Sequence, residues 1–311
     1  MNVLAIVVPV FVLIAIGWGA VYFKRVSEGG QKGIAEFAFS FAIPALLFRT
    51  IATSKALAVS PTSLWLVYFG ALFTTAAIAI LATRVILRRP SIDAASIAMT
   101  STYGNVVMLG LPLCLATLGP EAAAPMAVIL SIHTPILWGT GTILHQWMAH
   151  DGKEPAGRVF AKLVRDLARN PLIVAIVLGG IWRLTGFGLP EVIDKSLALL
   201  GQAGVPCSLV ALGMSLTNFA IKGQGPTLAL VLFLKLLVMP VLVAIGAWGA
   251  GLSPTAAGVA ILFAACPSGA NAYLFAAKVE RAVNSASGAV ALGTALSAIT
   301  TAVVVAVLSR G

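Results

Sequence analysis

Ten apolar runs, each about as long as a bilayer crossing, occupy most of the chain. A helix needs roughly 20 mostly apolar residues to cross the hydrocarbon core of a membrane. The runs cover residues 2–23, 34–53, 63–87, 92–118, 122–147, 170–186, 190–219, 227–249, 254–279 and 282–308. Because unpaired backbone groups are costly in lipid, runs of this length predict helices. We therefore expect an all-α polytopic membrane protein with ten transmembrane helices.

The composition is incompatible with an ordinary soluble domain. Hydrophobic residues make up 59% of the 311 residues and charged residues only 10%, whereas soluble domains carry roughly 25% charged residues. The net charge of +10 could suggest nucleic acid, but the Lys and Arg residues cluster between the apolar runs, which is typical of loops beside a membrane. We expect a lipid bilayer as partner and no nucleic acid.

The three cysteines, Cys114, Cys207 and Cys266, all lie inside apolar runs without the spacing of a metal site. The sequence therefore predicts no metal site, and it indicates no cofactor. The first run lacks a basic segment before it and is long enough to span, so we interpret it as the first helix and not as a signal peptide.

The basic residues predict the orientation of the helices. If the N-terminus lies outside the cytoplasm, the cytoplasmic connections hold 14 of the 20 Lys and Arg residues, the opposite connections hold five, and Lys235 lies within a run. Positive residues accumulate on the cytoplasmic side of membrane proteins. We expect a multi-pass protein of the cell (inner or plasma) membrane with both termini non-cytoplasmic.

A basic hydrophilic segment, residues 150–169, divides the runs into five and five. Because five is odd, the second half must enter the membrane inverted, which is the common plan of secondary transporters. The predicted organisation is a first repeat (1–149), a cytoplasmic linker (150–169) and a second, inverted repeat (170–311). Matching residues recur at offsets of 162, 165 and 166: Pro44 with Pro206, Pro61 with Pro226, and Asn105 with Asn271.

The fourth and ninth runs contain glycine and proline in mid-span, within 103–112 and 266–273. Unwound backbone survives at that depth only where protein or a water-filled cavity surrounds it, and two such breaks in corresponding positions indicate a transport site. The free N–H groups where a helix restarts suit a carboxylate. Proline kinks with small residues for close helix packing are the alternative. The candidate substrate-binding residues are Gly104, Asn105, Pro112, Pro267, Ser268, Gly269, Asn271 and Tyr273.

Two further polar residues lie deep in apolar runs. Lys235 stands nine residues after Pro226, roughly 13 Å into the membrane, where an ionisable group is a functional candidate by default. It could be a charge partner for substrate, reach the interface, or bond to unwound carbonyls. His133 could touch substrate, relay protons or pack between helices. The absence of a deep carboxylate argues against a classical proton antiporter, and the coupling ion, H⁺ or Na⁺, stays open.

Several motifs together resemble the auxin efflux carrier family, over nearly the whole chain. They are Gly104-Asn105 with Gly110-Leu111-Pro112-Leu113, Leu212-Gly213-Met214-Ser215-Leu216, Pro267-Ser268-Gly269-Ala270-Asn271, Ile43-Pro44-Ala45-Leu46-Leu47-Phe48, and Lys235 before Pro240. Without a long central loop, the chain is closer to the bacterial members, which include malonate carriers, than to the plant exporters. Ala272 stands where the plant exporters have a proline.

The resemblance implies a ten-helix inverted repeat related to bile-acid symporters and sodium/proton antiporters. It implies that the broken fourth and ninth helices cross at the site, that one domain moves against a scaffold in an elevator-type mechanism, and that the protein is a homodimer. The site residues that carry over are Asn105, Pro112, Pro267 and Asn271.

These features predict a secondary transporter of a small organic anion such as a malonate- or auxin-like carboxylate. Neither break contains an acidic residue or an arginine, so a cation would meet no countercharge there. No metalloprotease motif or pair of mid-membrane aspartates indicates an enzyme. An anion channel and a substrate-sensing receptor on the same fold are the alternatives.

Overall fold

A computed structural model describes residues 3–53, 60–149, 165, 168–221 and 225–309. Within these ranges every regular element is a helix, and one isolated β-bridge joins Gly104 to Ser268. The predicted linker therefore lies largely outside the described residues. Up to that linker the elements are α1 (Val3–Tyr22), α2 (Glu28–Phe37), η1 (Ala38–Ala42), α3 (Ile43–Thr53), α4 (Pro61–Val85), α5 (Ser91–Thr102), η2 (Val106–Gly110), α6 (Leu111–Leu118), η3 (Pro120–Ala122) and α7 (Ala123–Ala149).

The second half of the chain is helical as well. Its elements are α9 (Pro171–Leu184), α10 (Glu191–Leu216), α11 (Gly225–Phe233), η4 (Leu234–Val238), α12 (Met239–Gly249), α13 (Pro254–Ala265), α14 (Ala270–Lys278) and α15 (Val283–Leu308). Among the described residues, seven continuous helical segments are long and apolar enough to cross a membrane, and three shorter apolar helices cover Val106–Leu118, Pro171–Leu184 and Pro254–Ala265. The prediction of an all-helical, polytopic membrane protein agrees with this architecture.

Short polar-proline signals define where several helices begin. Ser60, Asn170 and Ser253 are N-caps whose side-chain oxygens accept hydrogen bonds from backbone N–H groups of the first turn, and each precedes a proline. A side-chain oxygen at the N-cap accepts a hydrogen bond from an otherwise unsatisfied N–H. The first helical position tolerates proline because the N–H that proline lacks would have no partner within the helix there. The start of α9 directly after Asn170 is important for the site described below.

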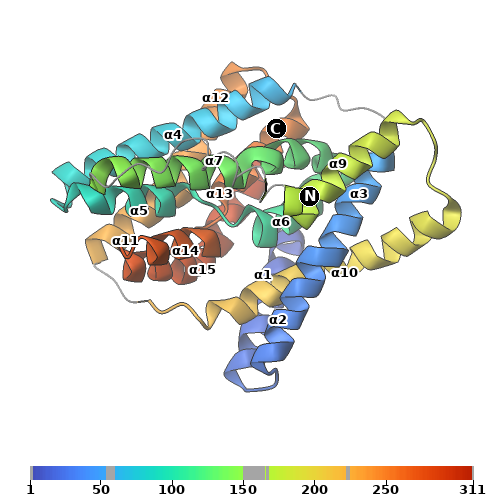
Figure 1. The fold of residues 1–311 in the computed structure, drawn as a ribbon, viewed down its shortest axis with the longest axis horizontal. Coiled ribbons are helices and arrows are strands. Elements are labelled where there is room, and N and C mark those ends of the chain that lie inside the picture. The colour runs from blue at the N-terminus through green and yellow to red at the C-terminus, as the bar shows by residue number, and fades with distance from the viewer. Residues whose placement is uncertain (1–2, 54–59, 150–164, 166–167, 222–224, 310–311) are drawn as a thin grey trace.

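The helices form two bundles, and each bundle takes helices from both halves of the chain. The first bundle comprises α1, α2, η1, α3, α9 and α10, and the second comprises α4 to α7 and α11 to α15. In Figure 1, α3, α9 and α10 lie on the right, while α4, α5 and α7 run alongside one another on the left. The bundles meet where α1 contacts α15, where α10 contacts η2, and where α3 contacts α7.

Within the first bundle α1 and α10 pack at backbone contact. A Cβ atom built on Gly213 would lie 1.9 Å from the Ile14 carbonyl oxygen, and one built on Gly17 would lie 2.1 Å from the Val210 carbonyl oxygen. Only glycine permits this approach, which is the use that membrane helices make of small residues. The first bundle is therefore a tightly packed unit.

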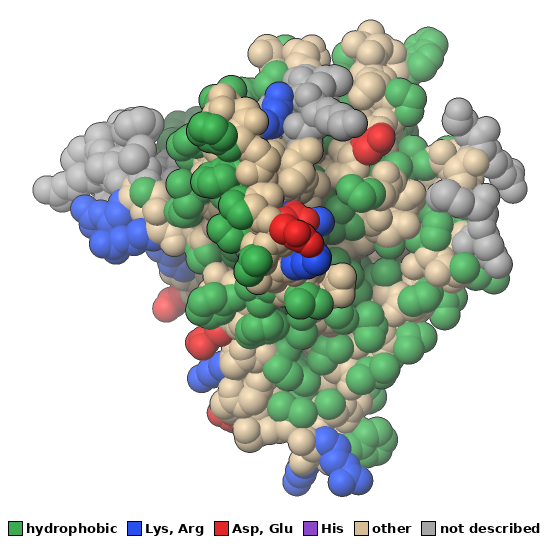
Figure 2. Space-filling view, turned by 90° about the vertical axis from the view of Figure 1, so that its right-hand side faces the viewer, with side chains coloured by type: hydrophobic (Ala, Val, Ile, Leu, Met, Phe, Trp, Pro, Cys, Tyr) green, Lys and Arg blue, Asp and Glu red, His purple; other side chains and the backbone are tan. Residues whose placement is uncertain are grey.

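The outer surface is suited to lipid. On α9 and α10 the exposed side chains include Val177, Leu178, Ile181, Ile193 and Leu199. Figure 2 shows a largely hydrophobic face on this side, with charged side chains around its margins and one small mixed cluster near its centre. A contiguous apolar surface of this extent would be a liability in water, and it fits a protein that faces the hydrocarbon core.

Candidate functional site

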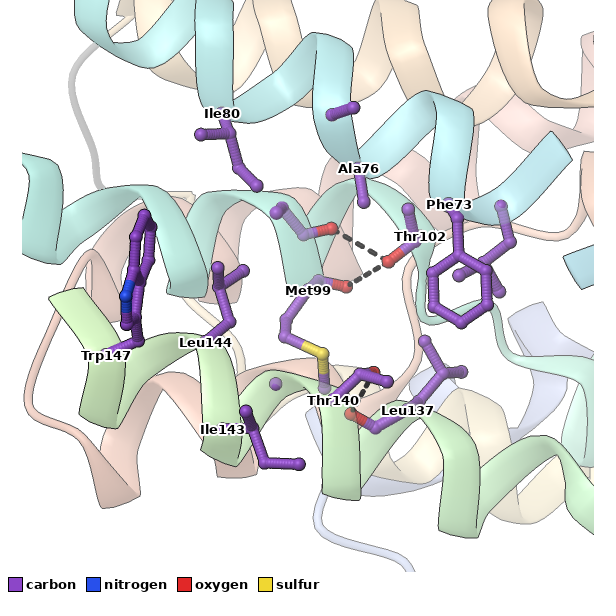
Figure 3. A pocket seen from close by; sticks show the side chains of 14 residues that line it. Phe73, Ala76, Ile80, Met99, Thr102, Leu137, Thr140, Ile143, Leu144 and Trp147 are labelled. Carbon is purple, nitrogen blue, oxygen red and sulfur yellow. Dashed lines mark hydrogen bonds between the residues drawn. The ribbon is translucent and has the colours of Figure 1, made fainter. Parts of the chain in front are cut away.

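Two of the cavities among the described residues differ in chemistry. One, of about 390 Å³, lies between α4, α5 and α7 and is lined by apolar side chains such as Phe73, Leu144 and Trp147 (Figure 3). The hydroxyls of Thr102 and Thr140, which reach it, are bonded to carbonyls of their own helices. Both hydroxyls already donate to carbonyls, so neither is free to bind an anion. This cavity is therefore unsuited to recognising one.

The second cavity, of about 580 Å³, lies against two non-helical stretches and between the two bundles. Its lining from the second bundle is Tyr103 to Met108, His133, Thr134 and Gly269 to Asn271. The first bundle contributes Phe39 and Ser40 of η1, and Arg169 to Leu172 at the start of α9. No aspartate or glutamate is among these lining residues. Nor do the described residues contain a His, Cys, Asp and Glu cluster that could hold a metal ion.

The two non-helical stretches are held together by hydrogen bonds. Residues 103–105 separate α5 from η2, and 266–269 separate α13 from α14. The Asn105 N–H donates to the Pro267 carbonyl at 2.7 Å, and the Gly269 N–H donates to the Tyr103 carbonyl at 2.9 Å. The Ser268 hydroxyl donates to the Thr100 carbonyl at 2.7 Å. Backbone groups freed by the interruption of each helix are thus paired with the other stretch, which satisfies much of their hydrogen-bonding demand.

Glycine and proline explain why the chain can do this. Pro267 has no N–H and favours an extended conformation at the residue before it. That residue, Cys266, is extended, with φ −60° and ψ 141°. At Gly269 a Cβ atom would lie 3.2 Å from Asn105 Cα and 3.3 Å from the Gly104 carbonyl oxygen. The two stretches therefore approach as closely as a glycine at this position allows.

Four backbone N–H groups remain free beside this contact. They belong to Val106 and Val107 at the start of η2, and to Ala270 and Asn271 at the start of α14. No other described residue accepts a hydrogen bond from any of them, and all four residues line the cavity. The first turn of a helix leaves such donors unsatisfied and carries partial positive charge. Two helix starts therefore face one cavity, and neither start carries an acidic residue.

The two asparagines extend this set of polar groups. Asn105 caps η2, its side-chain oxygen accepting from the Met108 N–H at 3.2 Å, which leaves its amide N–H₂ without a bond to any described residue. The Asn271 amide donates to the Tyr103 hydroxyl at 3.1 Å, and that hydroxyl donates to Thr134 Oγ1 at 3.0 Å. The non-helical stretch 103–105, α7 and α14 are thereby linked along the cavity wall.

His133 lies in the same wall and is only 1% exposed. Both of its ring nitrogens lack a hydrogen-bond partner in the described part of the chain. Its ring packs edge-to-face against Tyr103, with centroids 5.3 Å apart. A buried polar group without a partner is costly, so an unpaired imidazole on a polar cavity is a candidate for contact with a bound molecule.

Lys235 lies behind the site and does not line the cavity. It is fully buried in η4, and its ammonium donates to the Ala264 carbonyl and contacts Met239 Sδ. Ala264 stands in the last turn of α13, where carbonyls lack intrahelical partners. A Cβ atom on Gly104 would lie 3.2 Å from Lys235 Nζ. This geometry favours the bond to unwound carbonyls over a direct contact with substrate.

The predicted residues fall into two groups. Gly104, Asn105, His133, Gly269 and Asn271 come together on the cavity. The remaining ones do not line it: Pro112 lies buried in α6, Pro267 and Ser268 bond across to the other stretch, and Tyr273 packs edge-to-face on Phe219 with centroids 5.2 Å apart.

Sequence reasoning missed the contribution of the first bundle. Arg169 and Asn170 line the cavity, yet from sequence Arg169 is only one more basic residue of the segment 150–169. The available signal was its position directly before the Asn170-Pro171 helix start, which fixes it at the end of a short apolar helix.

Comparison with known proteins identifies the family. The sequence profile of the family described as "Membrane transport protein" matches residues 2–305. The chain belongs to this family, which is that of the auxin efflux carriers. The resemblance drawn from the motifs is thereby confirmed, and the chain is a multi-pass membrane protein of a transporter family.

Individual relatives are distant but cover most of the chain. The "Putative malonate transporter" of Rhizobium meliloti (strain 1021) is 25% identical over 96% of this chain and 93% of its own length. Auxin efflux carrier component 8 of Arabidopsis thaliana is 26% identical over 88% of this chain and 89% of its own. An uncharacterized transporter of Methanocaldococcus jannaschii is 25% identical over 70% of each chain.

Proposed function

We propose that this protein is a secondary transporter that moves a small organic anion, such as a carboxylate, across the cell membrane. The observation that carries the proposal is the pair of helix starts with four N–H groups that are free among the described residues and face a cavity whose described lining contains no acidic residue. Such ends attract anions, and a cation would find no countercharge there. The name of one relative refers to malonate, a dicarboxylate, which supports the same substrate class.

In the proposed complex a carboxylate accepts hydrogen bonds from the free N–H groups of η2 and α14. The Asn105 amide and the second N–H of the Asn271 amide add donors, and the His133 ring completes the polar wall. The roles proposed for the residues behind the cavity are indirect. Pro267 and Ser268 hold the two stretches together, Pro112 opens α6 directly after η2, and Tyr273 packs α14 against Phe219.

We propose ten spans in a 5+5 inverted repeat, with the fourth formed by α5, η2 and α6 and the ninth by α13 and α14. The equivalent placement of the two interruptions, and their mutual hydrogen bonds, support it. Both termini are proposed to lie outside the cytoplasm because of the basic bias of the connections.

The position of the cavity supports an elevator-type movement. The second bundle supplies both helix starts, whereas η1 and the start of α9 belong to the first, tightly packed bundle. Sliding the second bundle against the first would carry the bound anion with it. The homodimer implied by the family would anchor the first bundle.

Uptake and counterflow in proteoliposomes test the function. We expect saturable counterflow of labelled mono- or dicarboxylates and none of amines or neutral sugars, with the coupling ion identified from imposed H⁺ and Na⁺ gradients. Flux that does not saturate and shows no counterflow would indicate a channel, and binding without flux would indicate a receptor. Transport of a cation would refute the account of the site.

A further inference from the structure

We propose that Arg169 is a second anion contact, on the part of the cavity wall that the first bundle supplies, and that it makes the protein selective for dicarboxylates. This inference rests on the proposed function and assigns a finer substrate class to the same site. It depends on the charge, position and bonding of Arg169.

Arg169 is the one residue with a full positive charge among those that line the 580 Å³ cavity. It comes from the first bundle, at the start of α9, whereas the free N–H groups of η2 and α14 come from the second. The cavity therefore has two positive regions on different bundles. An elongated dianion can place one carboxylate in each, while a monoanion of the same length can use only one.

The guanidinium of Arg169 is available for a ligand. It forms no ion pair or hydrogen bond with any other residue that the structure describes, whereas Arg49 and Arg89 are paired with Asp194 and Asp93. Arg169 is exposed and lines the cavity. A guanidinium binds a carboxylate through two parallel hydrogen bonds, which an ammonium cannot reproduce.

The adjoining residues hold this arginine in place. Asn170 caps α9 by accepting from the Leu172 N–H at 2.9 Å, and Pro171 fixes the first helical residue. Helix α9 packs along α3 and contacts η1 and α7. Arg169 therefore directly precedes the N-cap of a docked helix.

Lys235 is the other buried or cavity-side cation to consider, and its geometry argues against this role. Its ammonium donates to the Ala264 carbonyl, and Lys235 is not among the residues that line the cavity. Among the described residues that line this cavity, Arg169 is therefore the positively charged side chain that a second carboxylate could bind.

The test compares succinate with monomethyl succinate, a monocarboxylate of similar length and shape, for binding to the purified full-length protein. In Arg169→Gln we expect the Kd of succinate to rise roughly five- to tenfold, as for a charge pair that is partly exposed. The Kd of monomethyl succinate should change less than about twofold. Arg169→Lys should recover part of the loss, because it restores the charge without the bidentate geometry.

Arg183→Gln is the matched control, since Arg183 stands near the other end of α9 and does not line the cavity. It should leave both ligands unaffected. Equal losses for both ligands in Arg169→Gln, or no loss for either, would overturn the inference and leave the proposed function standing. A wild-type protein that binds and transports neither these ligands nor any other carboxylate would instead overturn the proposed function itself.

Discussion

Replacing Gly213 with alanine tests the close packing of α1 on α10, on which the rigidity of the first bundle depends. The added Cβ atom would lie 1.9 Å from the Ile14 carbonyl oxygen and 2.9 Å from the Trp18 backbone nitrogen. Close carbon–oxygen contacts lie at about 3.3 Å or more, so the helices must move apart by roughly 1.4 Å. Overpacking of this kind costs about 1–3 kcal/mol or more, and the better helix propensity of alanine offsets at most about 1 kcal/mol of it.

The matched control is Gly70→Ala on α4, because a Cβ atom there would meet nothing within 4 Å. Both proteins would be unfolded thermally in detergent and followed by intrinsic fluorescence. We expect Gly213→Ala to melt several degrees below wild type, at roughly 2–4 °C per kcal/mol, and Gly70→Ala to melt at or slightly above it. If the two variants melt together, α1 and α10 do not approach as the structure has them, and the first bundle is not the rigid unit inferred here.

Three further predictions address the site and the topology. Asn105→Ala and Asn271→Ala should each weaken carboxylate binding by roughly five- to 100-fold, since each removes a polar group from the cavity wall; unchanged affinity in monodisperse protein would indicate a packing role. Lys235→Met should lower the free energy of unfolding by about 1–3 kcal/mol, because the Ala264 carbonyl loses its partner. The Lys235→Met variant should leave the ratio of succinate to monomethyl succinate affinity unchanged. A changed ratio would indicate that Lys235 contacts the substrate. A cysteine at Ser309 should react with impermeant reagent in intact cells and one at Glu280 should not, and the reverse pattern would refute the proposed orientation.

The helices could be predicted from sequence because the length of an apolar run limits where a membrane helix can begin and end. The run 190–219 corresponds to α10 (Glu191–Leu216), and 282–308 corresponds to α15 (Val283–Leu308). The run 254–279 was predicted with a break, and the glycine and proline in it coincide with the non-helical residues 266–269. Local chemistry was sufficient for these features.

The walls of the cavity could not be predicted in the same way. The bond from the Asn105 N–H to Pro267 joins residues far apart in the chain, and no local pattern specifies which side of a mid-membrane glycine faces water. Tyr273 is only two residues after Asn271, yet it turns away to Phe219 because successive positions on a helix point in different directions. Arg169 could not be predicted because its charge is typical of a loop residue. Only the packing of α9 brings it to the cavity.

In the proposed elevator-type mechanism, the division of the cavity between the bundles connects selectivity to movement. The free N–H groups of η2 and α14 would travel with the anion, whereas Arg169 would stay with the first bundle. A dicarboxylate held at both ends must therefore release Arg169 before the second bundle can move, and a monocarboxylate need not. Binding that is stronger in the starting state than in the moving state raises affinity without raising the rate of translocation, by the same reasoning that applies to ground-state binding in enzymes. Arg169→Gln should accordingly weaken dicarboxylate binding while the maximal rate of dicarboxylate transport is maintained or increased.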